Sequence, residues 1–230
     1  MSIRLYLLAD KARAGLFRRS GKRQREVRAL ITRHVLPVIG SPLPDEALPE
    51  QYPWCFAISP AALRGRYTCV GALAVLRSEE GEASLVAICG AVSYPWLKKN
   101  MRGDFPVTFW AARILNKVQK SDAAELDGKP LRQWLKALSR AYSPFWESFA
   151  LTPAWRFKNR SQALLREGSQ ADFYIRNHDG VEAMPWKNWP DCLQQEPGIW
   201  IWRQSRHKRI LDSQRIPLRR AEATSPDAPC

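Results

Sequence analysis

The sequence lacks the motifs that hold metal ions and nucleotides. It contains only three histidines, and its five cysteines form no C-x-x-C pair, so a zinc site would need ligands from distant parts of the chain. Neither G-x-x-x-x-G-K-S/T nor G-x-G-x-x-G occurs, which disfavours ATPases, kinases and dinucleotide-dependent enzymes. We therefore predict no metal and no cofactor.

Long apolar runs are also missing. The apolar run near the N-terminus, residues 5–9, is too short for the core of a signal peptide, and no stretch approaches the length that spans a membrane. An odd number of cysteines in a chain of 230 residues is not typical of a disulfide framework, and free thiols suit a reducing compartment. We expect a cytoplasmic protein with no transmembrane segment.

Acidic residues are scarce at the two ends of the chain. The whole chain has 36 Lys+Arg and 22 Asp+Glu, a net charge of +14. Residues 1–36 hold ten basic and two acidic residues, residues 203–220 hold seven and one, and the remainder holds nineteen of each. Because the whole excess lies at the two ends of a neutral body, we expect a polyanionic partner such as nucleic acid or anionic lipid.

The spacing of apolar residues predicts an α+β fold with N-terminal amphipathic helices. Good helix formers over residues 3–17 predict a first helix. A second amphipathic helix is predicted by an i, i+3, i+4, i+7, i+8 pattern. The residues of that pattern are Val27, Leu30, Ile31, His34 and Val35.

A central antiparallel hairpin or sheet is predicted to follow, with helices packed on it. Residues 69–93 contain two nearly continuous apolar runs around "EEGE", which indicates a hairpin covered on both faces. The remaining expected elements are helices over 107–118, 131–142 and 160–167, a hairpin whose turn spans 177–180, and a strand over 198–202 at a sheet edge.

We predict a single domain over residues 1–220. Its parts are a basic helical extension (1–36), a Pro-rich connection (37–53) and the α+β body. The small, polar and Pro-containing residues 221–230 predict a disordered tail.

One exposed row of cations is predicted on the second helix. A helix starting near Lys22 would carry Lys22, Arg25 and Arg28 on one face, and Glu26 is the single counter-charge. A solvated helix face usually alternates in sign, so this asymmetry favours a polyanion site. The predicted nucleic-acid-binding residues are Arg18, Arg19, Lys22, Arg23, Arg25, Arg28, Arg156, Lys158, Arg160, Arg203, Arg206, Lys208 and Arg209.

Aromatic residues next to cations offer a second mode of contact. Trp155 and Phe157 interleave with basic residues, the combination that single-strand binders use to stack on bases. The same alternation would also suit a strand with its rings in the core. Trp200 and Trp202 point to one side of their strand, and we expect them in the core.

Three functions are compatible with these features. We favour a non-enzymatic DNA- or RNA-binding protein, or a basic subunit of a prokaryotic ribonucleoprotein or DNA-processing complex of the mobile-element or antiviral-defence type, with other protein subunits as partners. The first alternative is a nuclease that uses His178 and Asp179 with Asp172 and Glu182, although these residue types are also ordinary in turns. The second is an adaptor for an acidic protein or an anionic membrane surface.

Overall fold

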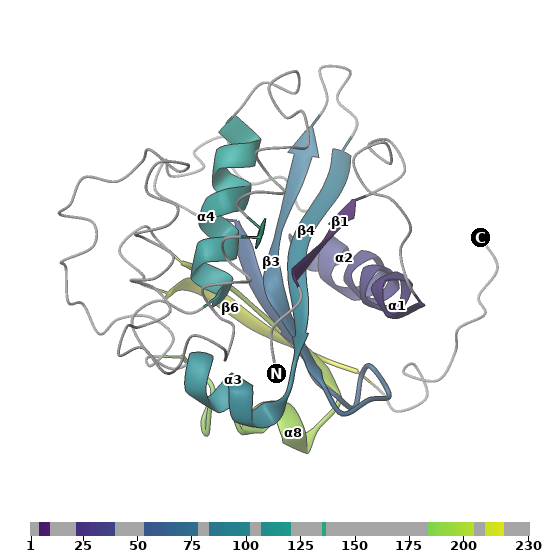
Figure 1. The fold of residues 1–230 in the computed structure, drawn as a ribbon, viewed down its shortest axis with the longest axis vertical. Helices are drawn as coiled ribbons and strands as arrows, with labels where there is room; N and C mark the ends of the chain where they lie inside the picture. The colour runs from purple at the N-terminus through teal and green to yellow at the C-terminus, as the bar shows by residue number, and fades with distance from the viewer. Residues whose placement is uncertain are drawn as a thin grey trace, which may run out of the picture.

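A six-stranded antiparallel sheet lies at the centre of the protein, with helices on both faces (Figure 1). The computed structural model describes residues 5–9, 22–39, 53–77, 83–101, 107–120, 135–136, 184–204 and 210–218. The strands are β1 (Leu5–Ala9), β2 (Trp54–Ile58), β3 (Thr68–Arg77), β4 (Ala83–Val92), β5 (Gly198–Gln204) and β6 (Ile210–Pro217). Their order across the sheet is β1-β4-β3-β2-β5-β6. The predicted α+β class is confirmed.

The hairpin predicted over residues 69–93 is confirmed as β3 and β4. These two strands pair antiparallel over their full lengths, and neither lies at an edge of the sheet. Successive side chains of β3 enter different cores: Val70 and Ala72 pack on one face, and Cys69 and Leu73 on the other. A strand buried on both faces needs apolar residues at nearly every position, which is why the two runs are continuous.

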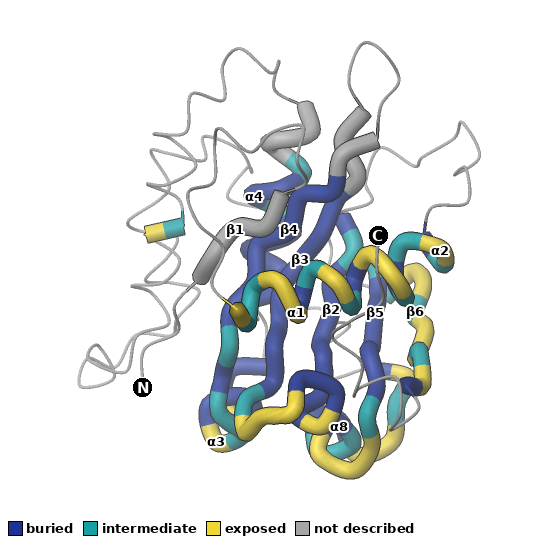
Figure 2. The backbone as a smooth tube through the Cα atoms, turned by 90° about the vertical axis from the view of Figure 1, so that its right-hand side faces the viewer, coloured by how far each residue is buried: buried dark blue, intermediate teal, exposed yellow. Residues whose placement is uncertain are grey.

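One face of the sheet is covered by a continuous helical segment. It consists of α1 (Lys22–Leu30), the π-helical turn η2 (Ile31–Val35) and α2 (Leu36–Ile39), and it crosses the strands toward β6 (Figure 2). Val27, Ile31 and Val35 are fully buried against this face, which confirms the second predicted helix. Pro37 belongs to α2, so the helix extends into the range predicted as a Pro-rich connection; residues 40–52 lie outside the described residues.

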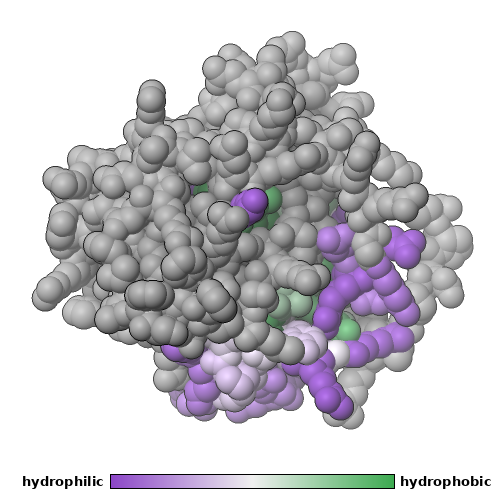
Figure 3. Space-filling model, viewed as in Figure 1, coloured by the Kyte–Doolittle hydropathy of each residue, from purple (hydrophilic) through white to green (hydrophobic). Residues whose placement is uncertain are grey.

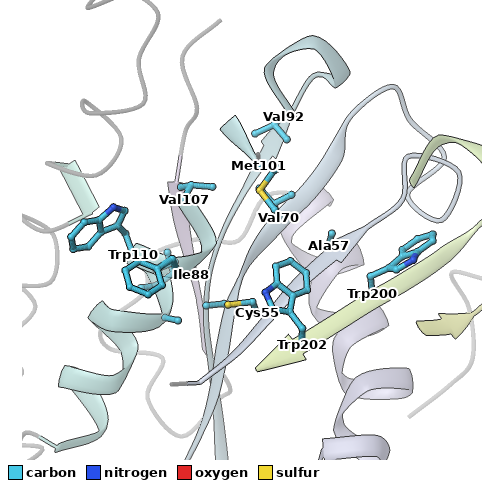
Figure 4. Packing of buried hydrophobic residues seen from close by; sticks show 14 of the residues in the cluster. Cys55, Ala57, Val70, Ile88, Val92, Met101, Val107, Trp110, Trp200 and Trp202 are labelled. Carbon is cyan, nitrogen blue, oxygen red and sulfur yellow. The ribbon is translucent and has the colours of Figure 1, made fainter. Parts of the chain in front are cut away.

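Helices α3 (Tyr94–Asn100), α4 (Val107–Lys120) and α8 (Cys192–Gln195) belong to the opposite side of the sheet. The helix predicted over 107–118 is confirmed as α4, which runs along β3 (Figure 1). Trp110 of α4 is buried in the same cluster as Trp200 and Trp202 of β5 (Figure 4). The expected core position of both β5 tryptophans is therefore confirmed.

The helix predicted over residues 3–17 is wrong at residues 5–9. These residues form β1, which pairs antiparallel with β4, from Leu5 opposite Gly90 to Ala9 opposite Val86. Helix propensity differs among such residues by only a few tenths of a kcal/mol, whereas β4 offers a row of backbone partners. Residues 10–17 lie outside the described residues.

The strand predicted at residues 198–202 is confirmed as β5, but its predicted edge position is wrong. Part of the basic segment that follows folds back as β6 and pairs with β5, with Ile199 opposite Ile216 and Arg203 opposite Asp212. Ile210 and Ile216 are half-buried, one against each core, and this apolar contact draws the segment onto the sheet.

Several predicted elements fall largely or wholly outside the described residues. They are the helix over 160–167, the turn at 177–180 and the tail at 221–230. Of the helix predicted over 131–142, residues 135–136 are described, and they are helical. Among the described helices, none is both long and apolar enough to cross a membrane.

Candidate nucleic-acid interface

Helix α1 presents a row of cations to solvent. Val27 faces the sheet, and a turn of 100° per residue directs Lys22 and Arg25 to the opposite side of the helix. Both of these side chains are exposed, and Arg28 lies half-buried beside them. Arg33 is exposed on η2 and continues the row beyond the predicted set.

The first turn of α1 carries cations where acidic residues are usual. A helix N-terminus has a partial positive charge, which favours Asp and Glu and disfavours Lys and Arg. The first turn of α1 nevertheless holds Lys22, Arg23 and Arg25, and no acidic residue. The helix forms because its residue types have good propensity and because Val27 is buried. Its positive charge therefore does not stabilise the helix itself.

Arg23 connects α1 to the loop between β2 and β3. Its guanidinium lies over the ring of Tyr67, 5.1 Å from the ring centroid. Its Nη2 atom lies 2.8 Å from the position that a Cβ on Gly65 would occupy. The loop brings two further exposed arginines, Arg64 and Arg66, next to α1.

Arg64 and Arg66 were not among the predicted site residues. They lie about forty residues after α1 in the chain, and the packing of Arg23 on the loop joins them to the helix. One signal was present, because residues 53–77 contain no Asp or Glu. We call the cations of the helix and the loop the α1 basic surface: Lys22, Arg23, Arg25, Arg28, Arg64 and Arg66.

The α1 basic surface has little opposing charge. Within the described part of the chain, no ion pair involves Lys22, Arg25, Arg28 or Arg66, and Glu26 is the single carboxylate in residues 22–39 and 53–77. Hydrophilic residues gather over α1 on the right-hand side of Figure 3. Such a surface concentrates anions by long-range attraction.

Arg203 lies on the α1 side of the sheet. Ile201, two residues earlier on β5, is buried against the α1 side, and alternate strand residues share a face. The Arg203 guanidinium lies over the ring of Trp54, 4.9 Å from its centroid, and forms an ion pair with Asp212 at 3.6 Å. Arg203 therefore belongs to the same face as α1, with its charge partly offset.

Arg215 has a different environment. It pairs across the hairpin with Trp200, and its guanidinium lies 5.4 Å from the centroid of that ring, on the side of the sheet away from α1. It also forms an ion pair with Glu196. The contacts of Arg215 hold β6 against β5, so part of the C-terminal basicity stabilises the fold.

The other predicted site residues lie outside the described residues. They are Arg18, Arg19, Arg156, Lys158, Arg160, Arg206, Lys208 and Arg209, the stacking candidates Trp155 and Phe157, and the nuclease candidates Asp172, His178, Asp179 and Glu182. Their roles in binding or catalysis stay predictions from the sequence.

The described residues offer no metal site, and the Cys55 thiol is a poor nucleophile candidate. In these ranges no three His, Cys, Asp or Glu side chains come together in a way that could hold a metal ion. Cys55 is fully buried, its Sγ atom lying 3.6 Å from the carbonyl oxygen of Thr108 and 3.7 Å from Oε1 of Gln204. Burial raises the pKa of the Cys55 thiol far above its ordinary value, so it stays protonated.

Comparison with known proteins gives no match, whether to a protein-family model, to a curated protein or to a solved structure. The function is therefore inferred from the charge and geometry of the α1 basic surface.

Proposed function

We propose that the protein binds nucleic acid through the α1 basic surface. In this proposal it acts without catalysis, as a binding protein or as a basic subunit of a cytoplasmic ribonucleoprotein or DNA-processing complex of the mobile-element or defence type. The supporting observation is that six cations from two separate elements adjoin, while Glu26 is the single carboxylate in those elements. The cations also occupy the helix end where they are least favourable, which is understandable if a polyanion is their partner.

The proposed contact is with backbone phosphates rather than with base edges. Arg and Lys side chains neutralise phosphates and release condensed counterions, a source of affinity that does not depend on sequence. In the described part of this surface the aromatic ring next to α1 is Tyr67, and Arg23 lies over it. Any stacking on bases would come from Trp155 and Phe157, which remain part of the proposal.

The segment after β5 would extend the same surface. Arg203 lies on the α1 side of the sheet, and Arg206, Lys208 and Arg209 follow it in the connection to β6. The two basic ends of the chain would then contact one nucleic acid, which explains why the excess charge is divided between them.

A binding survey tests this function. The intact protein is titrated against labelled single- and double-stranded DNA and RNA at physiological salt, with and without Mg²⁺, and the oligonucleotides are then examined for cleavage. We expect binding to at least one type and no cleavage. Cleavage that His178→Ala abolishes would establish the nuclease alternative. Binding to anionic phospholipid vesicles without binding to any oligonucleotide would establish the adaptor alternative.

A further inference from the structure

Strand β6 forms one edge of the described sheet and has β5 as its neighbour on the inner side (Figure 2). It is eight residues long, whereas β1 at the other edge has five. A long edge strand presents a row of backbone donors and acceptors to which another strand can add. The β6 side chains are mostly exposed, and Leu211, at 44%, is the single large apolar side chain exposed in the described ranges.

The hydrogen bonding to β5 shows which backbone groups of β6 point outward. The Leu218 N–H donates to the carbonyl oxygen of Pro197 at 3.2 Å, in the same register that pairs β5 with β6. In an antiparallel pair, residues alternate between those that bond to the neighbouring strand and those that do not. Gln214 therefore bonds to β5, and the N–H and C=O groups of Ser213 and Arg215 point away from it.

Two features limit this outward row, one at each end. Pro217 has no N–H to donate. At the other end, the register with β5 passes from Asp212 directly to Ile210, so Leu211 is the extra residue of a β-bulge. The proline and the bulge lie at equal distances in sequence from Gln214. The stretch that can pair with another strand is therefore centred on Gln214.

We propose that β6 pairs with β6 of a second copy of this chain, antiparallel and about a two-fold axis at Gln214. Identical strands related by such an axis pair with one residue opposite its own copy. Ser213 then lies opposite the partner's Arg215, and the two residues exchange both of their outward N–H to C=O hydrogen bonds. Leu211 lies opposite the partner's Pro217, so the bulge of one strand meets the proline of the other and the exposed leucine is covered.

The charges of β6 suit a second copy in this register. Asp212 and Arg215 leave the strand without net charge, in a chain whose net charge is +14. Asp212 lies opposite the partner's Ile216, so the pairing opposes no like charges. An axis at Arg215 would oppose two guanidinium groups, which is unfavourable. An axis at Ser213 would place the bulge opposite Arg215 and lose the hydrogen bonds there.

The pairing also brings the α1 basic surfaces of both copies to one side of the extended sheet. Gln214 pairs with Ile201, which is buried on the α1 side, so Gln214 faces that side too. Opposed residues share a face of a sheet, and the α1 side of one copy therefore continues as the α1 side of the other. One nucleic acid would contact both surfaces; this step alone rests on the proposed function. Such binding holds the two copies at a high effective concentration.

Sedimentation equilibrium of the intact protein, without nucleic acid, tests the pairing. The contact is small, and small interfaces are weak, so we expect a dimer with a Kd of about 100 μM. Each copy carries +14, so association should strengthen as salt rises, whereas binding to nucleic acid should weaken. A protein that stays monomeric at high concentration and high salt would overturn the proposal and leave the proposed function untouched.

Charge exchange at Gln214 tests whether the contact is on β6. Gln214→Lys and Gln214→Glu each oppose like charges at the axis, and each should weaken the dimer about fivefold, whereas an equal mixture should form a heterodimer as tight as the unmodified one. Ser213→Pro removes an outward donor, keeps the bonds to β5 and should also weaken the dimer. The matched control is Gln195→Lys, at an exposed position of α8, and it should change the Kd little. A dimer that Gln214→Lys weakens no more than Gln195→Lys would overturn the β6 contact.

Discussion

The guanidinium of Arg23 lies over the ring of Tyr67, 5.1 Å from its centroid, and this contact joins α1 to the loop between β2 and β3. It holds together two groups of cations that are distant in sequence. The proposed surface therefore depends on packing as well as on charge, and the contact can be altered without changing the net charge.

Replacing Tyr67 tests this contact. Tyr67→Leu should lower the free energy of unfolding by about 0.5–1 kcal/mol, the range for a cation–π pair at a partly exposed site. Tyr67→Phe keeps the ring and should retain most of that free energy. Urea unfolding of both variants measures the difference. Equal stability of the two variants would show that the ring face contributes nothing.

Gly71 tests the register of the central hairpin. A Cβ at this position would lie 2.1 Å from the carbonyl oxygen of Ile88 and 2.7 Å from Cβ of Cys89, so the β4 backbone would have to move. We expect Gly71→Ala to lower the free energy of unfolding by about 3 kcal/mol. At Gly198 the nearest atoms to such a Cβ, the Ile216 carbonyl oxygen and Cζ3 of Trp200, both lie at 3.2 Å, so Gly198→Ala should lower the free energy of unfolding by less. The opposite ranking in urea unfolding would contradict the pairing of β3 with β4.

Burial of Cys55 predicts a specific dependence of stability on pH. Its pKa is raised in the folded protein, so the unfolded chain releases the thiol proton first, near the ordinary pKa of 9.0. The stability due to this group is complete below that pH and falls by at most about 1.4 kcal/mol per pH unit above it. Cys55→Ala removes this dependence. Unfolding free energies between neutral and alkaline pH should therefore fall less steeply for Cys55→Ala than for the unmodified protein; parallel slopes would be inconsistent with a buried, protonated thiol.

The interior elements of the fold were predictable because their patterns are local. The hairpin of β3 and β4 is recognisable from two apolar runs around a turn, and the buried face of α1 from the spacing of Val27 and Ile31. β2 was not predicted, because the strand of five residues follows Pro53 in a Pro-rich stretch.

The edges of the sheet were not predictable from local pattern. β1 has the composition of a helix, and β6 begins within a basic segment that resembles a tail. Each becomes a strand because a neighbour offers it a row of backbone hydrogen-bond partners. That partnership depends on residues far away in the chain, so a local pattern carries no sign of it.

The candidate site was predictable in its helical half only. The row of Lys22, Arg25 and Arg28 follows from the helix period, since a spacing of three residues places successive members on adjacent turns of one face. Arg64 and Arg66 join the row through the contact of Arg23 with Tyr67 and through the close approach at Gly65, neither of which is encoded by spacing.

The salt dependence of binding tests the role of the α1 basic surface most directly. The variant replaces Lys22, Arg25 and Arg28 together by Gln, which keeps helix propensity close to that of Lys and Arg. The control replaces Lys99, Lys136 and Lys187 by Gln. These three exposed lysines belong to elements packed on the opposite core, and the control makes the same change in net charge.

The measurement is the slope of log Kobs against log salt concentration for one oligonucleotide. If the three residues of α1 contact phosphates, the slope of the α1 variant should be shallower by about 2–3, since each lost phosphate contact contributes about 0.7–0.9. The control should keep the slope of the unmodified protein. An unchanged slope for the α1 variant, or an equal loss in the control, would contradict a nucleic-acid interface on α1.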